Sequence, residues 1–132
     1  MTITIKDSRQ EVVCAFADFA LADLAASGSF NNAIQVPADA IVLGGYIAFS
    51  EVFNSTTSDV FTVGDTVDDD EYGAAISGQA AALTALVPTG YKYAAQTYLG
   101  IKWTSGGGTP TTGIGRLVVY YMVTTKCDFT QG

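Results

Sequence analysis

Polar and apolar residues alternate with a period of two over much of the chain, whereas the spacing typical of helices is scarce. Such alternation is typical of β-strands with one buried face. It predicts strands separated by turn signals at residues 2–5, 12–19, 30–36, 41–53, 60–63, 83–87, 97–104 and 114–125. We therefore expect an all-β fold of about eight strands, in which two antiparallel sheets pack as a jelly-roll β-sandwich.

No internal repeat and no linker divides the sequence. Residues 1–132 are therefore expected to form a single β-sandwich domain, since this length suits one hydrophobic core. Residues 1–10 form a candidate N-terminal arm, because the alternation of Thr and Ile at residues 2–5 predicts a short strand ahead of the main core.

The longest predicted strand, residues 41–53, assigns side chains to opposite faces of a sheet. Alternation places five apolar side chains on one face: Ile41, Leu43, Ile47, Phe49 and Phe53. Gly44 and Gly45 interrupt the strand, which indicates a bulge or the close approach of another segment. The same reasoning directs one set of side chains inward, Leu99, Ile101 and Trp103, and another set outward, Tyr46, Tyr98 and Tyr120.

Three segments are less regular. Residues 14–26 are rich in alanine and could form a helix that ends near Gly28, but its faces would be poorly patterned, so we favour a strand followed by a turn at residues 23–28. Residues 54–58 read as a turn, since Asn, Ser and Thr bond their own backbone there. Residues 72–82 predict a loop or a short helix.

The composition indicates a folded protein with a covered surface. Of the 132 residues, 48% are hydrophobic and only 14% are charged, so disorder is not expected and part of the surface is expected to meet a partner. The net charge is −7 and the six basic residues are scattered, which argues against nucleic acid as a partner. The longest apolar run is too short to span a membrane, and no signal peptide is visible, so synthesis in a cytoplasm is expected.

Catalytic and metal chemistry find little support. The chain has no histidine, which removes Ser-His and Cys-His nucleophile pairs and the common zinc sites. Residues 68–71 are all acidic, and an EF-hand frame starting at Asp68 fails because Tyr72 and Gln79 occupy ligand positions. An irregular calcium loop with Asp65, Asp68 and Asp70 is an alternative to the favoured interpretation, a solvated acidic corner.

Other candidate sites are weaker still. Glu51 and Asp59 are candidate carboxylates for a glycosidase, and residues 106–113 lack the lysine of a phosphate-binding loop. Cys14 and Cys127 are either two thiols or a bridge between an early and a late strand. Exposed tyrosines could stack on sugars, although packing between sheets or subunits is more common. We predict no catalytic residue, no metal site and no cofactor, and hence not an enzyme.

Several blocks of the sequence, taken in order, resemble a known family. They are "ADLAASG", "VPADAIVLGGYIAFSEVFNSTTSDVFTVGD", "DEYGAA", "ALTALVPTGYKY" and "TPTTGIGRLVVYY", and they cover most of residues 22–121. Their order and spacing resemble the jelly-roll capsid decoration, or cement, proteins of tailed bacteriophages. No catalytic residue carries over from this family, and the two cysteines are not part of the pattern.

The resemblance implies a protein on the outer surface of an icosahedral phage head, made in the bacterial host. Its partners would be the major capsid protein, whose neighbouring subunits it clamps, and further copies of itself in a dimer or trimer. The candidate contact residues are Ile3, Ile5, Tyr46, Tyr98 and Tyr120, because an arm strand can add to an open sheet edge and aromatic side chains are enriched in interfaces. The alternative is a virion-attached carbohydrate-binding module or a tail or baseplate subunit of the same fold.

Overall fold

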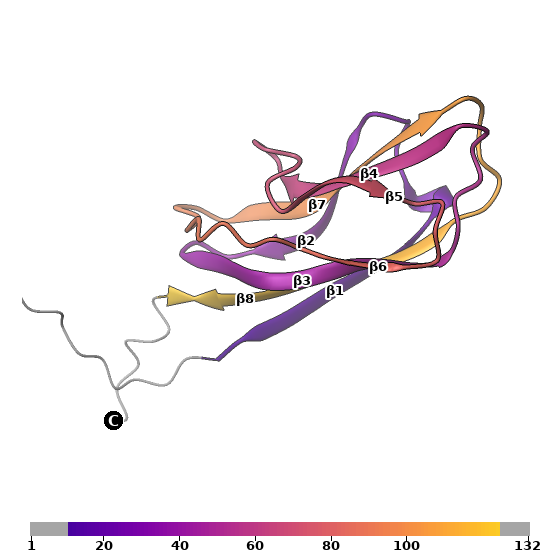
Figure 1. Ribbon diagram of the computed structural model, residues 1–132. Helices are drawn as coiled ribbons and strands as arrows, with labels where there is room; N and C mark the ends of the chain where they lie inside the picture. Colours follow the sequence, from indigo (N-terminus) through magenta and orange to yellow (C-terminus); the bar gives the residue numbers. More distant parts are fainter. Residues whose placement is uncertain (1–10, 125–132) are drawn as a thin grey trace, which may run out of the picture.

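The computed structural model describes residues 11–124, which form eight strands and one short 3-10 helix (Figure 1). In chain order these elements are β1 (Val13–Ala20), η1 (Leu21–Asp23), β2 (Phe30–Val36), β3 (Ala40–Glu51), β4 (Ser58–Asp65), β5 (Gly73–Ser77), β6 (Leu83–Ala85), β7 (Thr97–Gly106) and β8 (Ile114–Val123). None of the helices in this part of the chain is long and apolar enough to cross a membrane.

The strands form two antiparallel four-stranded sheets that pack face to face (Figure 1). Sheet A has the order β1-β8-β3-β6, and sheet B has the order β2-β7-β4-β5. The chain crosses between the sheets at nearly every connection, so that the first and last strands are neighbours in sheet A. This strand order is that of a jelly roll, and it confirms the predicted fold class.

The core lies between the two sheets and is built around aromatic rings. Phe49, Phe53 and Phe61 meet with ring centroids 4.8 to 6.0 Å apart, and Phe19 and Trp103 extend the cluster to either side. The predicted inward side chains Leu99, Ile101 and Trp103 are all buried, as are Leu117 and Val119 of β8. Alternation therefore predicted the inner face of β7 correctly.

Along β3 the side chains that face the core switch from even-numbered to odd-numbered positions. The structure therefore differs from the prediction in the first half of this strand. The register with β8 shifts between Val42 and Gly44, so Ala40 and Val42 point into the core while Leu43 is 41% exposed. Beyond the bulge, Ile47 and Phe49 face inward as predicted. The assignment of Ile41 and Leu43 to the core face was wrong, because a bulge adds one residue and reverses every side chain before it.

The predicted close approach at the glycine pair is confirmed. Gly45 has a φ of +140°, and a Cβ atom there would stand 2.0 Å from the carbonyl oxygen of Val118 in the neighbouring strand. Only glycine lets the two backbones meet at this distance. The bulge and the contact therefore have one cause, which is the tight pairing of the two central strands of sheet A.

The irregular segments have mixed outcomes. Residues 14–26 form a strand followed by η1 and a turn, as favoured over the helix. Residues 72–82 contain the strand β5, which was not predicted because its small residues show no alternation; it is specified by pairing with β4. The predicted strand at residues 2–5 lies outside the residues that the structure describes.

Candidate functional site

The outer surface of sheet A is apolar and crosses all four strands. Phe16 of β1 and Tyr46 of β3 both stand directly opposite Val118 of β8, and partners in an antiparallel register share a face. Tyr120 and Leu83 continue this surface along β8 and onto β6. We call Phe16, Leu83, Tyr46 and Tyr120, which surround the buried Val118, the apolar face. Phe16 and Leu83 are each 60% exposed, so the apolar face is open to a partner.

Beside the apolar face lies one ion pair and a shallow groove. Arg116 donates two hydrogen bonds to the carboxylate of Asp18, of 2.5 and 3.1 Å, and its guanidinium carbon lies 5.0 Å from the centroid of the Phe16 ring. The hydrogen bond from Arg116 lowers the pKa of Asp18 and raises the pKa of Arg116. The groove, of about 510 Å³, is lined by this pair together with Tyr46 and Leu83.

The predicted contact tyrosines are divided between the two sheets. Tyr46 and Tyr120 lie together on the apolar face, whereas Tyr98 lies on the outer surface of sheet B and is 40% exposed. Tyr98 stands opposite Gln35, and Lys102 further along β7 stands opposite Thr62. Sheet B therefore presents a more polar surface than sheet A. The other two predicted contact residues, Ile3 and Ile5, lie outside the described residues.

The structure describes only one of the two cysteines. Cys14 is exposed on the outer surface of sheet A, opposite Tyr120. Cys127 lies outside the described residues, so the predicted alternatives of two thiols or one bridge stay open.

Asp59 is a buried structural acceptor at the end of the sandwich that carries the turn at residues 54–58. It is 1% exposed and accepts four hydrogen bonds: two from the backbone N–H and hydroxyl of Ser55, one from Gln79 and one from the indole of Trp103. Burial raises its pKa, but the four donors together hold the pKa below its ordinary value. Each carboxylate oxygen of Asp59 already accepts two hydrogen bonds inside the fold. Asp59 is therefore not placed to act as a catalytic acid.

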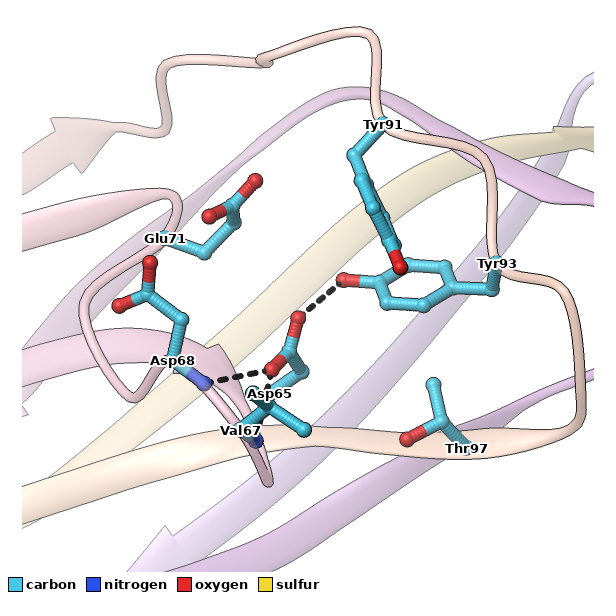
Figure 2. A pocket seen from close by; sticks show the side chains of 7 residues that line it. All are labelled: Asp65, Val67, Asp68, Glu71, Tyr91, Tyr93 and Thr97. Carbon is cyan, nitrogen blue, oxygen red and sulfur yellow. Dashed lines mark hydrogen bonds between the residues drawn. The ribbon is translucent and has the colours of Figure 1, made fainter.

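A pocket of about 200 Å³ opens at the opposite end of the sandwich (Figure 2). We call it the end pocket; its lining residues are Asp65, Val67, Asp68, Glu71, Tyr91, Tyr93 and Thr97. They come from the loop after β4 and from the segment that leads into β7. In Figure 2 the acidic side chains of Asp68 and Glu71 stand across the pocket from the two tyrosine rings.

Asp65 anchors the floor of the end pocket. It is 6% exposed; one carboxylate oxygen accepts the backbone N–H groups of Val67 and Asp68, and the other accepts the hydroxyl of Tyr93 at 2.7 Å. The Tyr93 and Tyr72 hydroxyl oxygens are 2.5 Å apart. Burial raises the pKa of Tyr72 to about 12, and burial together with these hydrogen bonds raises the pKa of Tyr93 as well. Asp65 is thus part of the fold and is not grouped with Asp70 as a calcium ligand.

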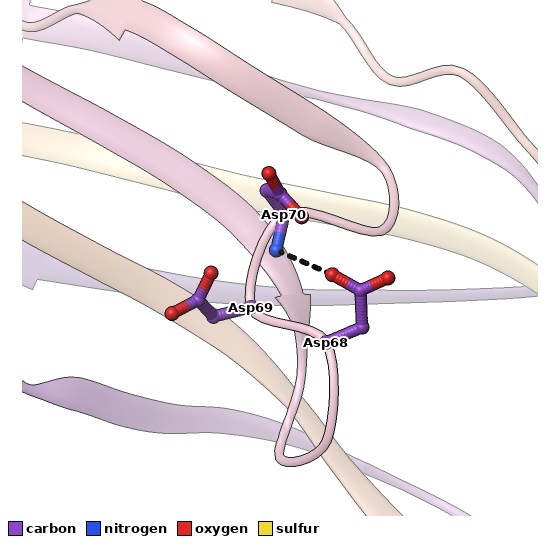
Figure 3. A group of neighbouring side chains, drawn as sticks. All are labelled: Asp68, Asp69 and Asp70. Atoms are coloured by element: carbon purple, nitrogen blue, oxygen red, sulfur yellow. Dashed lines mark hydrogen bonds between the residues drawn. The ribbon is translucent and has the colours of Figure 1, made fainter.

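The acidic corner itself is a set of solvated side chains. Oxygens of Asp68, Asp69 and Asp70 lie within 4.8 Å of one another (Figure 3). Asp69 pairs with Lys102 at 2.9 Å, and Asp68 accepts a hydrogen bond from the backbone N–H of Asp70. Hydrogen bonding within the corner lowers the pKa of Asp68 and raises the pKa of Asp70. Asp68 and Asp70 are exposed to solvent and Asp69 is half-buried.

Sequence reasoning missed the end pocket. It singled out Asp65 and the acidic run but not Tyr91 and Tyr93. The segment that carries these tyrosines is held by backbone hydrogen bonds to the start of β3 and by the hydrogen bond from Tyr93 to Asp65. The only signal in the sequence was the "YKY" alternation after the turn at residues 88–90. A pattern so short does not show which other segment of the chain these tyrosines contact.

Comparison with known proteins finds likeness at the level of the fold. No protein-family model matches the chain, and no curated protein matches it. A chain of the cyanophage Pam1 capsid asymmetric unit superposes with a TM-score of 0.70 at 18% identity, covering 93% of this chain and 91% of that one. A chain of the acidic stable capsid of Helicobacter pylori bacteriophage KHP30 gives 0.68 at 14%, covering 89% and 93%. A chain of the Ralstonia phage GP4 capsid gives 0.68 at 17%, covering 93% and 90%. The jelly-roll fold of this chain is therefore shared with chains of phage capsid structures over nearly their whole length.

Proposed function

We propose that the chain is a capsid decoration, or cement, protein of a tailed bacteriophage. The observation that carries the proposal is the fold shared, over about nine tenths of both chains, with chains of three phage capsids. The near-complete coverage of both chains matters, because the likeness extends over the whole sandwich and not over a few strands alone. We further propose that residues 1–132 form one decoration domain with residues 1–10 as its arm.

In this role the protein binds the outer surface of the head and bridges subunits of the major capsid protein, as a dimer or trimer. The apolar face is the surface best suited to such a contact. A large apolar side chain that is fully buried contributes about 1.5 to 3 kcal/mol, and Phe16, Leu83 and Tyr120 are all exposed large hydrophobics. Many copies on one shell would add these modest contributions, and no catalytic group is needed.

The first test is quantitative mass spectrometry of purified virions, with this chain measured against the major capsid protein. A copy number comparable to that of the shell protein supports head decoration. A copy number far below it points to the tail, the baseplate or an adhesion site, and absence from the particle refutes the proposal.

The second test measures binding of the purified protein to expanded shells of its own phage. Phe16→Asp is expected to weaken binding strongly, because it places a charge in the apolar face. Thr104→Asp is the matched control, since Thr104 is exposed on the outer surface of sheet B. Equal binding by both variants would show that the apolar face is not the surface that contacts the shell.

A further inference from the structure

The end pocket has a size and a lining that the proposed function leaves unused. Its volume of about 200 Å³ is below the range of roughly 300 to 1,000 Å³ typical of sites for drug-sized ligands. It therefore suits the end of a single side chain better than a whole cofactor or an oligosaccharide. Its lining combines the buried carboxylate of Asp65 with the exposed side chains of Asp68 and Tyr91.

Among the residues that the structure describes, no ion pair involves Asp65, Asp68 or Glu71 of the end pocket. The ion pairs found there use other acids, namely Asp18, Asp39 and Asp69. Asp65 is stabilised by neutral donors alone, and Glu71 accepts a hydrogen bond from the hydroxyl of Thr89 at 2.6 Å. Low-dielectric walls focus the field of such charges, so the pocket attracts a positive group.

The opposite wall is aromatic and held in place. The ring of Tyr91 packs edge-on against the ring of Tyr93, with centroids 5.0 Å apart. Tyr93 cannot swing away without breaking its hydrogen bond to Asp65, whereas the side chain of Tyr91 is 54% exposed and accessible to a ligand. A cation over a tyrosine face is attracted by the ring quadrupole. This wall is a second feature, separate from the carboxylates, that selects for positive charge.

A guanidinium group fits these two walls better than an ammonium group or a bare metal ion. It is planar, so it can stack on a tyrosine ring and at the same time donate two parallel hydrogen bonds to a carboxylate. It is also weakly hydrated, which lowers the cost of bringing it into a narrow pocket. A metal ion or an ammonium group has no flat face with which to stack on the ring.

We propose that the end pocket binds the guanidinium group of an arginine side chain presented by a neighbouring protein. Tyr91 supplies the stacking surface, and Asp68 and Glu71 accept the hydrogen bonds at the mouth. Naming a capsid shell subunit as the source of that arginine rests on the proposed function, but the pocket's preference for guanidinium does not.

The test uses the isolated full-length protein and a probe of defined chemistry. Nα-acetyl-arginine methylamide is titrated while protein NMR spectra are recorded, and Nα-acetyl-citrulline methylamide serves as the uncharged ligand of the same shape. The arginine probe is expected to cause saturable shifts at the amides of Val67 and Asp68 and at the Tyr91 ring, weakened by salt. Equal shifts from the citrulline probe, or shifts confined to other residues, would overturn the proposal.

Variants separate the pocket from general attraction to an acidic protein. Tyr91→Leu keeps an apolar wall without the ring face, and Glu71→Gln keeps the shape without the charge; each should weaken the arginine probe about threefold. Asp23→Asn removes an exposed acid at the other end of the sandwich and should leave the affinity unchanged. Unaltered affinity in both pocket variants, with native-like spectra, would refute the site.

The outcome is distinguishable from that of the proposed function. Arginine binding by a chain that is absent from virions would support the pocket and refute decoration. A chain abundant on the head that showed no arginine binding would leave decoration standing and refute the pocket.

Discussion

The buried carboxylate of Asp59 offers the sharpest test of how this fold is held together. It accepts four hydrogen bonds of 2.7 to 2.9 Å and joins the turn at residues 54–58 to the segment after β5 and to β7. The substitution Asp59→Asn keeps the shape but converts one acceptor oxygen into a donor. The Ser55 hydroxyl can turn to accept from the new amide, but in the best orientation the indole N–H of Trp103 loses its acceptor.

The expected cost follows from this count. A buried donor left without a partner costs about 1 to 3 kcal/mol, and hydrogen bonds to a neutral amide are weaker than those to a charged carboxylate. The smaller desolvation cost of an amide offsets part of this loss. We expect Asp59→Asn to lower the free energy of unfolding by about 2 to 4 kcal/mol, a large share of the stability of a small domain.

The assay is denaturant unfolding followed by fluorescence, for which Trp103 is the single tryptophan of the chain. Asp70→Asn is the matched control, because Asp70 is an exposed acid in the acidic corner, and it should leave the midpoint almost unchanged. A loss in Asp59→Asn no greater than that of the control would refute the idea that the four donors require a carboxylate.

The pH dependence gives a second check on the same residue. The pKa of Asp59 is lowered in the folded state, so its stabilising contribution is present above the ordinary aspartate pKa of about 3.9 and is lost as the pH falls below it. The stability difference between the wild type and Asp59→Asn should therefore shrink in acid. A difference that grows as the pH falls would contradict the sign of this linkage.

Three further predictions rest on close packing and buried hydroxyls. Gly45→Ala should destabilise the protein by about 3 kcal/mol in denaturant unfolding, because its Cβ would strike the backbone of β8. Gly28→Ala, also at positive φ but with nothing within 4 Å, should cost only about 1 kcal/mol. Tyr93→Phe removes the hydroxyl that donates to Asp65 and should cost about 1 to 3 kcal/mol by the same assay; no loss would mean that the hydroxyl is dispensable. Tyr72 should ionise near pH 12 in a spectrophotometric titration, and because that pKa is raised, stability should fall as the pH rises above about 10; ionisation near 10 would contradict its burial.

Within the candidate sites, alternation predicted directions but not neighbours. It placed Tyr46, Tyr98 and Tyr120 outward, and all three lie on outer surfaces. Alternation did not show that Tyr46 and Tyr120 share the apolar face while Tyr98 lies on the other sheet. The two-residue period gives the side of a strand on which a residue lies, but not the sheet to which the strand belongs. Phe16, the most exposed aromatic of that face, lies in the alanine-rich segment at residues 14–26, where the pattern assigned no outward face.

The sequence by itself determined the fold class, the strands β2, β7 and β8, and the inward side chains of β7. These follow from local rules: a strand with one buried face must alternate, and a turn needs residues that bend the backbone. Only the tertiary structure decided the parity of β3, the existence of β5 and the end pocket. The bulge at Gly44 depends on how tightly β3 meets β8, β5 is stabilised by its pairing with β4, and the pocket joins segments more than twenty residues apart. These features arise from contacts between distant parts of the chain. A local sequence pattern does not determine which distant segment it will pair with.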